Sequence, residues 1–432
     1  MLRSDPVSPK TSQILRARIV VPVSRPPIEN GAVLISGDRI RAVGSWSDFA
    51  RRHSANSHDL GEVVLLPGLV NAHCHLDYTD MAGQIAPPHS FTDWIKCLVE
   101  LKSDWGYSDF AQSWLNGARM LVRTGTTTVG DIEAVPVLLP AVWEATPLRV
   151  ISFIELLGVR RHHTPADLLA KAAAVMARLP AGHSRAALSP HAPYSTTPEL
   201  LRRVAALARD REWLVSTHVA ESSEEYEMFK AATGPMFEWL AQGERDMSDC
   251  GGVSPVQHVE RAGLLSENLV AIHLNHLDAG DAELLARRGV SVVHCPRSHD
   301  YFAHRSFPLP GLMRAGVNLC LGTDSLVTTR RVPGQPLQLD LFAEMRALRS
   351  AWVSAAPERV LRLVTVNAAR ALGLAGRVGE IIEEASADLI TVPFGGPLRK
   401  VYEELTHRAG PVSASMMGGK WVIPPAGERE LV

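Results

Sequence analysis

LLPGLVNAHCH, residues 65–75, is the stretch that decides the fold of this chain. An apolar run that is interrupted by Pro-Gly and ends in His-x-His predicts a buried strand over residues 63–75, with two imidazoles at one end of a sheet. Residues i and i+2 of a strand share a face, so His73 and His75 can bind one ion while Cys74 points away from it. Histidines near a strand end also occur as ordinary core or surface residues, so this stretch alone leaves both interpretations open.

Three later segments repeat the arrangement of an apolar run that ends in side chains able to bind a metal. They are residues 216–221 (STHVAE), 271–276 (AIHLNH) and 321–325 (LGTDS). Imidazole and carboxylate groups are common ligands of Zn²⁺ in proteins. Their repetition at strand ends favours a metal site over isolated core histidines.

Strand and helix patterns alternate between these segments. Several helix patterns begin with Pro or with a Ser or Asp cap, and they cover residues 108–123, 165–179, 198–209 and 278–288. Predicted strands cover residues 63–75, 126–131, 149–157, 185–191, 213–221, 269–276, 290–296 and 317–324. Eight such repeats predict an α/β fold of the (β/α)8 TIM-barrel class, whose active site lies at the carboxyl ends of the strands. A doubly wound open sheet is the alternative, but its first strand lacks a Gly-rich phosphate turn.

Both ends of the chain carry short strand patterns. Residues 14–23 and 31–44 alternate in polarity, with a hairpin turn at Gly37-Asp38. Similar patterns with glycine turns return at residues 376–382, 387–392 and 412–423. Because such short strands cannot bury both faces alone, we expect a small β-sandwich domain from residues 1–66 plus 376–432 and a barrel domain of residues 67–375.

Composition limits the possible partners. The 432 residues are 46% hydrophobic and 21% charged, which is ordinary for a globular protein with a large core. A formal net charge of −2 provides no field that would attract nucleic acid or an anionic membrane. We therefore expect a small-molecule substrate, no nucleic acid and no membrane as partners.

The cysteines and the first residues indicate the compartment. The segment MLRSDPVSPK (residues 1–10) lacks the apolar core of a signal peptide, and the chain has no run of 18 or more apolar residues. Five cysteines, an odd number, are scattered without a Cys-x-x-Cys pair, which argues against a disulfide framework and a thiolate zinc site. We expect a cytoplasmic protein.

Four motifs carry the functional prediction: residues 67–75 (PGLVNAHCH), 217–221 (THVAE), 294–298 (HCPRS) and 321–325 (LGTDS). Together they closely resemble the amidohydrolase superfamily. Within it the chain is most similar to the cytosine deaminase and chlorohydrolase (TRZ/ATZ) branch, which includes S-adenosylhomocysteine and aminodeoxyfutalosine deaminases. The resemblance covers nearly the whole chain, including residues 366–374 (VNAARALGL).

The resemblance implies a mononuclear metal site. His73, His75, His218 and Asp324 would hold one divalent ion, zinc first and iron as the alternative, with a position left for water. A binuclear site of this fold needs a carbamylated lysine at the end of the fourth strand. Residues 188–195 (LSPHAPYS) contain no lysine, which favours one ion.

The resemblance also implies three catalytic residues. Asp324 would accept a proton from water, Glu221 would protonate a ring nitrogen and pass the proton to the leaving group, and His273 would stabilise the tetrahedral intermediate. Glu221 has a rival interpretation as a solvated carboxylate at a helix start. His276 is the alternative to His273, which we prefer because family members keep the first histidine of the pair.

Three residues are predicted on the substrate side. His191 resembles the family histidine that hydrogen-bonds a purine-type ring. Trp94 can stack on a flat substrate or serve as a core aromatic of an amphipathic helix, and Arg160 can meet an anionic tail or remain solvated. Many relatives carry Asn where this chain has His299, so we expect a different pocket wall. The long connection over residues 222–263 is expected to form a lid or substrate wall.

These features predict a metal-dependent hydrolase that acts on a C–N bond of a small cyclic substrate. The leading reaction is deamination of an aminated purine nucleoside, such as aminodeoxyfutalosine or an adenosine-like compound, with release of ammonia. Alternatives are a triazine-type chlorohydrolase, a formimino or amide hydrolase, and a catalytically dead scaffold protein. A scaffold predicts lost ligands, and none is lost in the motifs. Relatives often form dimers, so a homodimer is the expected assembly.

Overall fold

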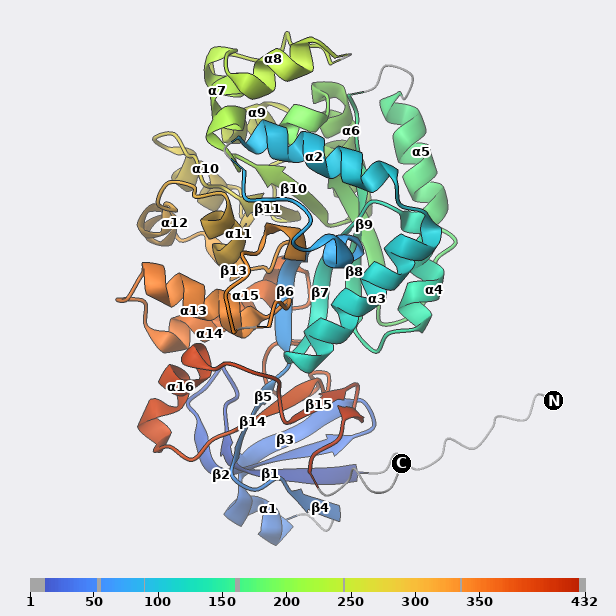
Figure 1. The fold of residues 1–432 in the computed structure, drawn as a ribbon. Helices are drawn as coiled ribbons and strands as arrows, with labels where there is room; N and C mark the ends of the chain where they lie inside the picture. The colour runs from blue at the N-terminus through green and yellow to red at the C-terminus, as the bar shows by residue number, and fades with distance from the viewer. Residues whose placement is uncertain are drawn as a thin grey trace, which may run out of the picture.

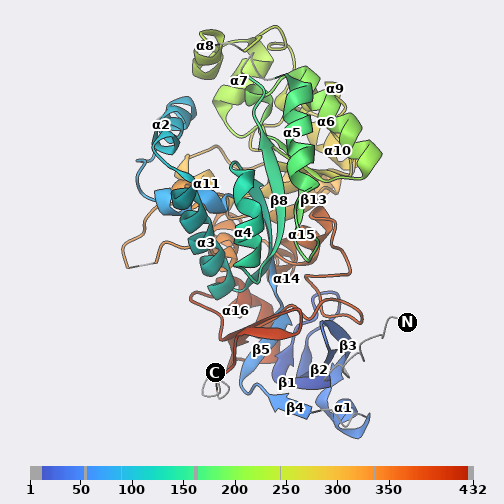
Figure 2. The same ribbon diagram turned by 90° about the vertical axis from the view of Figure 1, so that its right-hand side faces the viewer.

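The computed structural model describes residues 12–52, 56–88, 90–159, 164–243, 245–334 and 336–426. Two eight-stranded sheets organise the chain. One sheet forms the barrel and the other lies beneath it, built from strands near both ends of the chain (Figure 1). The view turned by 90° shows the same two parts (Figure 2). The predicted TIM barrel with a small β unit from both termini is therefore confirmed, while the residue boundaries of the two domains stay a prediction.

The barrel sheet follows the chain strand by strand, from β6 to β13, with parallel pairing throughout. A parallel bridge between Cys74 and Asp324 brings its two edge strands together. The strands are β6 (Leu69–Cys74), β7 (Thr126–Glu133), β8 (Arg149–Leu156), β9 (Arg185–Pro190), β10 (Val215–Val219), β11 (Leu269–His273), β12 (Ser291–His294) and β13 (Asn318–Leu321). All eight predicted strands are present.

Helices surround the barrel and shield its strands from solvent. They are α2 (Phe91–Ser103), α3 (Tyr107–Arg123), α4 (Leu139–Glu144), α5 (Pro165–Met176), α6 (Pro198–Arg211), α10 (Asp281–Arg287), α11 (Pro296–Tyr301), α12 (Leu309–Ala315), α13 (Leu341–Ala351), α14 (Pro357–Leu363) and α15 (Val366–Ala371). The turns η1 (Leu76–Met81), η2 (Pro136–Leu138), η3 (Pro193–Ser195) and η4 (Leu326–Thr328) are 3₁₀ helices. Pro165 and Pro198 begin α5 and α6, as predicted, and the side chains of Thr164 and Thr197 before them accept backbone N–H bonds.

The second sheet joins the two ends of the chain in the order β16-β15-β14-β5-β1-β2-β3, with β4 beside β1. Its strands are β1 (Ser12–Val20), β2 (Ile28–Ser36), β3 (Arg39–Ser45), β4 (Asn56–Asp59), β5 (Val63–Pro67), β14 (Leu389–Pro393), β15 (Ala414–Met417) and β16 (Lys420–Ile423). Helices α1 (Trp46–Arg52) and α16 (Val401–His407) and turn η5 (Leu398–Lys400) complete this part. The predicted hairpin at Gly37-Asp38 is confirmed by the β2–β3 pairing.

Two predicted strands differ in the structure. Residues 376–382 are turns, because Gly376 and Gly379 adopt positive φ angles of 73° and 78°, although Ile381 is still buried in the core of the small sheet. The predicted strand over residues 63–75 is two strands, β5 in the small sheet and β6 in the barrel. Gly68 separates them, and a Cβ there would lie 2.2 Å from the Thr127 side chain.

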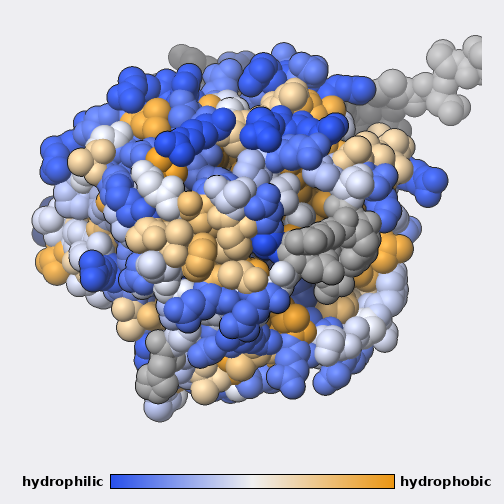
Figure 3. Space-filling model, turned by 90° about the horizontal axis from the view of Figure 1, so that it is seen from above, coloured by the Kyte–Doolittle hydropathy of each residue, from blue (hydrophilic) through white to orange (hydrophobic). Residues whose placement is uncertain are grey.

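The segment after β10 contains α7 (Ser223–Ala231), α8 (Pro235–Ala241) and α9 (Pro255–Arg261). With α2, helices α7 and α8 lie over the end of the barrel that is opposite the small sheet (Figure 1). Seen from that end, hydrophobic residues form small groups among hydrophilic ones (Figure 3). Among the described residues, no helix is long and apolar enough to cross a membrane.

Candidate active site

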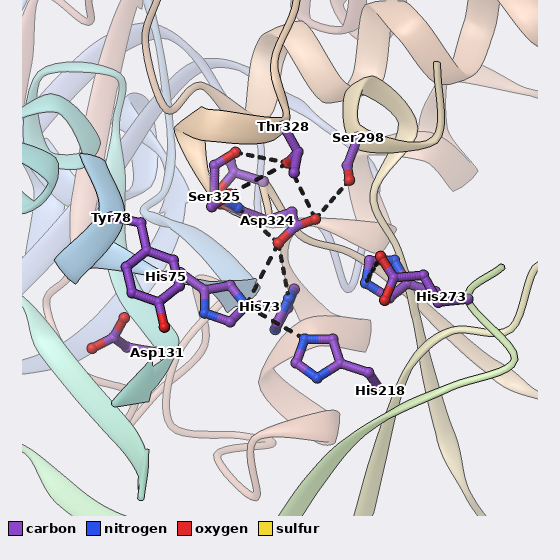
Figure 4. Close-up of polar contacts among 12 residues, drawn as sticks. His73, His75, Tyr78, Asp131, His218, His273, Ser298, Asp324, Ser325 and Thr328 are labelled. Carbon is purple, nitrogen blue, oxygen red and sulfur yellow. Dashed lines mark hydrogen bonds and ion pairs between the residues drawn. The ribbon is translucent and has the colours of Figure 1, made fainter. Parts of the chain in front are cut away.

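Side chains from four barrel strands converge at the end covered by α2, α7 and α8. His73 and His75 belong to or follow β6, His218 lies on β10, His273 ends β11, and Asp324 follows β13 (Figure 4). The Nε2 atoms of His75 and His218 lie 3.4 Å apart. One carboxylate oxygen of Asp324, Oδ1, lies 3.3 Å from His73 Nε2 and 3.6 Å from His75 Nε2. The four residues predicted as metal ligands therefore surround one point.

The donor set fits a divalent metal ion. Ligand atoms of His73, His75 and His218 all lie within 4.8 Å of one another, and so do those of His73, His273 and Asp324. Both ring nitrogens of His73 are buried and have no hydrogen-bond partner among the described residues. Leaving such atoms unpaired is costly, so a ligand that accepts their lone pairs would stabilise the site.

Burial keeps the imidazoles in the form that binds metal. Burial, reinforced by His73, lowers the pKa of His75 well below its usual value and lowers the pKa of His218 to about 4. Burial also lowers the pKa of His273. These rings are therefore neutral at pH 7. Burial by itself would raise the pKa of Asp324, but the adjacent imidazoles of His73, His273 and His75 hold it well below its usual value. Neutral imidazoles with one carboxylate suit zinc or iron.

Hydroxyl and backbone groups orient the Asp324 carboxylate. Ser298 Oγ donates to its Oδ2 over 2.6 Å, and Thr328 Oγ1 donates to the same oxygen over 3.3 Å. The Ser325 N–H donates to Oδ1 over 2.7 Å. Figure 4 shows these contacts on the side of Asp324 away from the histidines. Thr328 lies outside the motifs, so sequence reasoning missed it.

The chain leaves three of these strands through left-handed backbone conformations. Ala220 after β10 has φ 53°, Leu274 after β11 has φ 54°, and Asp324 after β13 has φ 54°. His273 has φ 75°. A non-glycine residue in this region costs energy and persists only where its surroundings enforce it. The chain thus turns sharply at each of the three exits, next to Glu221, His273 and Asp324.

Glu221 lies beside the converging imidazoles. Its Oε1 is 3.4 Å from His273 Nε2, and its backbone N–H donates to Glu225 Oε2 over 2.8 Å. Burial, and then the charge of Asp324, raises the pKa of Glu221 well above its usual value. Of the two candidate histidines after β11, His273 faces this carboxyl. The ring of His276 instead lies near Tyr226, 6.3 Å away between ring centroids.

The structure describes two of the three residues predicted to contact the substrate. His191 follows β9, and its carbonyl accepts a hydrogen bond from His218 Nδ1 over 2.8 Å. Its own Nδ1 lies 2.7 Å from Ser195 Oγ, and 22% of its side chain is exposed. Trp94 on α2 is 8% exposed and packs edge-on against Phe302, 5.0 Å between centroids, as a core aromatic does. Arg160 lies outside the described residues.

A group of buried carboxyls beside the site was not predicted from the sequence. It comprises Asp77, Asp131 and Glu133, which are buried, and Glu155, which is partly buried. Burial raises the pKa of all four, that of Asp131 to about 7. Asp131 accepts hydrogen bonds from the Leu76 N–H and from Trp114 Nε1, each over 2.9 Å. Three of the four lie on β7 or β8 near their carboxyl ends, so the strand-end rule that indicated the histidines could have found them.

Glu224 links the lid region to the site. Its carboxylate accepts the backbone N–H groups of Phe91 and Thr92, each over 2.9 Å, at the first turn of α2. A carboxylate at a helix N-terminus satisfies unpaired donors and complements the helix dipole. The loop that carries Glu221 and the helix that carries Trp94 are therefore tied together.

A family model and several named proteins match this chain. A family model described as "Amidohydrolase family" matches residues 64–422, and an imidazolonepropionase-like composite domain of bacteria matches residues 31–53. The chain is 32% identical over 417 residues to a 5-methylthioadenosine/S-adenosylhomocysteine deaminase of Syntrophobacter fumaroxidans, covering 91% of this chain and 88% of the relative. It is 28% identical over 310 residues to an aminodeoxyfutalosine deaminase of Deinococcus radiodurans, covering 69% and 72%.

A solved structure of similar fold carries a metal. The adenosine deaminase from Xanthomonas campestris with bound zinc superposes with a TM-score of 0.82 at 27% sequence identity, covering 95% of this chain and 92% of that chain. At this coverage the similarity includes both the barrel and the small sheet of this chain.

Proposed function

The chain belongs to the amidohydrolase family, and from this premise we propose that it is a metal-dependent deaminase of an aminated purine nucleoside. The superfamily predicted from the four motifs is thereby confirmed. The chain is a hydrolase that acts on carbon–nitrogen bonds other than peptide bonds, with a small molecule as substrate. The observation that carries the specific proposal is the Glu221 carboxyl, 3.4 Å from His273 and beside the metal-binding side chains.

We assign the metal to His73, His75, His218 and Asp324, with zinc as the first expectation and iron as the alternative. The fit rests on the neutral imidazoles, the ionised carboxylate and the unpaired ring nitrogens of His73. When bound, such a cation supplies Lewis acidity and a source of hydroxide near neutral pH. Relatives of this family are metal-dependent, and one solved neighbour holds zinc.

The protein side chains then move the protons. Asp324 accepts the proton of the nucleophilic water. Burial and the charge of Asp324 favour the protonated form of Glu221, so it donates a proton to the ring nitrogen next to the carbon under attack. Glu221 then takes the hydroxyl proton of the tetrahedral adduct and passes it to the departing amino group, and the water proton held by Asp324 returns to Glu221 through solvent. His273 hydrogen-bonds the developing oxyanion. One water is consumed, the ring C–NH₂ bond breaks, and ammonia leaves while a ring carbonyl forms.

The proposed substrate class rests on the names of the relatives. Relatives are named as deaminases of 5-methylthioadenosine and S-adenosylhomocysteine, whose names contain adenosine, and of aminodeoxyfutalosine. We propose that His191 hydrogen-bonds the purine ring and that Arg160 contacts the rest of the substrate. The cytoplasmic location, the homodimer and the lack of nucleic-acid and membrane partners belong to the same proposal.

Ammonia release tests the reaction. We expect the zinc- or iron-loaded protein to release ammonia from one or more of a panel of adenine nucleosides, aminodeoxyfutalosine, guanine, cytosine and formimino acids, with an adenine nucleoside preferred. Chloride release from a triazine, without ammonia from the panel, would favour the chlorohydrolase alternative. Inactivity of the loaded protein with every compound and leaving group would favour the scaffold alternative.

Glu221→Gln tests the proton transfer. Because Gln cannot donate the proton, we expect turnover to fall by about 10²–10⁴-fold while one metal ion per chain is retained. Metal content by mass spectrometry and ammonia release measure the two effects. Glu283→Gln, at an exposed position on α10, is the matched control and keeps wild-type turnover. Near-normal activity of Glu221→Gln rules out its role as the proton donor.

A further inference from the structure

Asn275 and His299 form a hydrogen-bonded chain that ends at Glu221. Asn275 Nδ2 donates to the Glu221 carbonyl over 2.9 Å, and the Asn275 Oδ1 lies 3.1 Å from His299 Nδ1. Asn275 is buried, with 6% of its surface exposed. We infer that this pair positions Glu221 for proton transfer, with His299 acting through Asn275. The inference rests on the proposed function, because it concerns the proton donor of that reaction.

The backbone around Glu221 needs such support. Ala220, directly before it, has a left-handed φ of 53°, a conformation that costs about 1–3 kcal/mol unless the surroundings impose it. The loop after β11 supplies two donors to successive carbonyls here, since the His276 N–H donates to Ala220 O over 3.1 Å and Asn275 donates to Glu221 O. Glu225 accepts the Glu221 N–H. Both sides of the Glu221 peptide unit are thus held.

The Glu221 carbonyl fixes which way the Asn275 amide points, and His299 pairs with the amide oxygen. The amide nitrogen must face the Glu221 carbonyl to donate, so the amide oxygen faces His299, and Nδ1 of His299 must carry the hydrogen that this oxygen accepts. An amide turned the other way would place its oxygen against the Glu221 carbonyl, where two acceptors repel. The ring of His299 is itself packed between His294 and His304, with centroids 5.2 Å and 5.4 Å away.

Four variants test the hydrogen bonds between His299, Asn275 and Glu221. Asn275→Leu keeps the size of the side chain and removes both hydrogen bonds. His299→Phe keeps a ring and removes the donor, whereas His299→Asn restores one, because Asn Nδ2 and His Nδ1 stand the same number of bonds from Cα. His304→Phe is the control, since its ring contacts His299 but no described hydrogen bond of its side chain reaches Asn275 or Glu221.

We expect Asn275→Leu and His299→Phe to lower kcat by about 10–100-fold, the usual cost of losing a partner that orients an active-site group. KM should change less than about threefold, and zinc content should remain at one ion per chain. His299→Asn should recover most of the lost kcat, and His304→Phe should match the wild type. A kcat unchanged in both variants, or equal losses in His299→Asn and His299→Phe, would overturn the inference.

A second measurement needs no turnover. Hydrogen exchange in the zinc-loaded protein should accelerate at the amides of Glu221 and His276 in Asn275→Leu and His299→Phe, but not in His299→Asn or His304→Phe. Unchanged exchange contradicts the positioning role even if no substrate has been found. An inactive wild type with the expected exchange pattern contradicts the proposed function alone. If Asn275→Leu does not fold, the comparison of His299→Phe with His299→Asn still decides.

Discussion

At the scale of single residues, burial sets the chemistry of the site. The imidazoles of His75, His218 and His273 lose affinity for protons because water is excluded, so their nitrogen lone pairs are free near neutral pH. The same exclusion raises the pKa of the Glu221 carboxyl. One physical cause therefore leaves the imidazoles unprotonated and favours a proton on the carboxyl that lies 3.4 Å from His273.

His218→Ala tests the metal assignment. Removing one of the four proposed ligands should reduce the bound metal from about one ion per chain towards zero after dialysis against a chelator that leaves the wild type loaded. Metal analysis of the folded variant provides the measurement. His183→Ala, at an exposed histidine that hydrogen-bonds Leu148 O, should retain the ion. A fully loaded His218→Ala protein would reject this ligand.

At the scale of elements, the contact between β6 and the end of β13, here called the seam, sets how closely His73 and Asp324 approach each other. The N–H groups of Thr323 and Asp324 both donate to the His73 carbonyl, over 3.0 Å and 3.2 Å. Gly322 permits this approach, because a Cβ there would lie 2.8 Å from His73 Cβ and 2.8 Å from His73 O. The absence of a side chain at Gly322 thus lets His73 and Asp324 lie close together.

Gly322→Ala should force β13 and β6 apart. We expect a loss of about 1–3 kcal/mol in the free energy of unfolding, as overpacking usually costs, together with weaker metal binding. Urea unfolding of the metal-free protein and a metal titration measure the two effects. Gly311→Ala is the control: it lies in α12, nothing stands within 4 Å of its added Cβ, and alanine favours helices. Equal behaviour of the two variants would show that the seam tolerates a side chain.

At the scale of the whole molecule, two opposing sets of buried groups shape the response of stability to pH. Buried carboxyls such as Asp131, Glu225 and Glu344, each with a pKa raised to about 7, stabilise the fold at low pH and lose this contribution as pH rises through 7. Buried histidines act in the opposite sense. Burial, opposed by Asp249, lowers the pKa of His258 to about 4, so the unfolded chain binds its proton more readily.

His258→Phe isolates one of these contributions. In the wild type the contribution of His258 is complete above its unfolded pKa of about 6.5 and is lost as pH falls from there to about 4. Relative to the wild type, the variant should therefore gain stability across this window, by at most about 3 kcal/mol. Urea unfolding at pH 7.5, 6 and 5, with chelator present throughout, tests this. A stability difference that stays constant with pH would contradict it.

Much of the fold and of the candidate site could be predicted because its signals are local. Each barrel strand is a short apolar run, and residues such as His73, His75, His218 and Asp324 stand at or beyond strand ends. Parallel topology then brings strand ends together whatever the loops do. The Pro-Gly interruption in residues 65–75 can be seen in the sequence. The sequence does not show that this interruption divides the segment into β5 of the small sheet and β6 of the barrel. This division depends on pairing of β5 with β14, more than 300 residues later.

The sequence by itself determined the alternation of strands and helices, the barrel, and the residue types at its ligand end, because periodicity and strand-end position are properties of short segments. Only the tertiary structure decided that residues 376–382 form turns, that Trp94 packs in an aromatic core, and that Asn275 and His299 reach Glu221. Burial and hydrogen bonding depend on which distant segments meet, and no pattern within one segment records its partners. That dependence is the physical reason for the division.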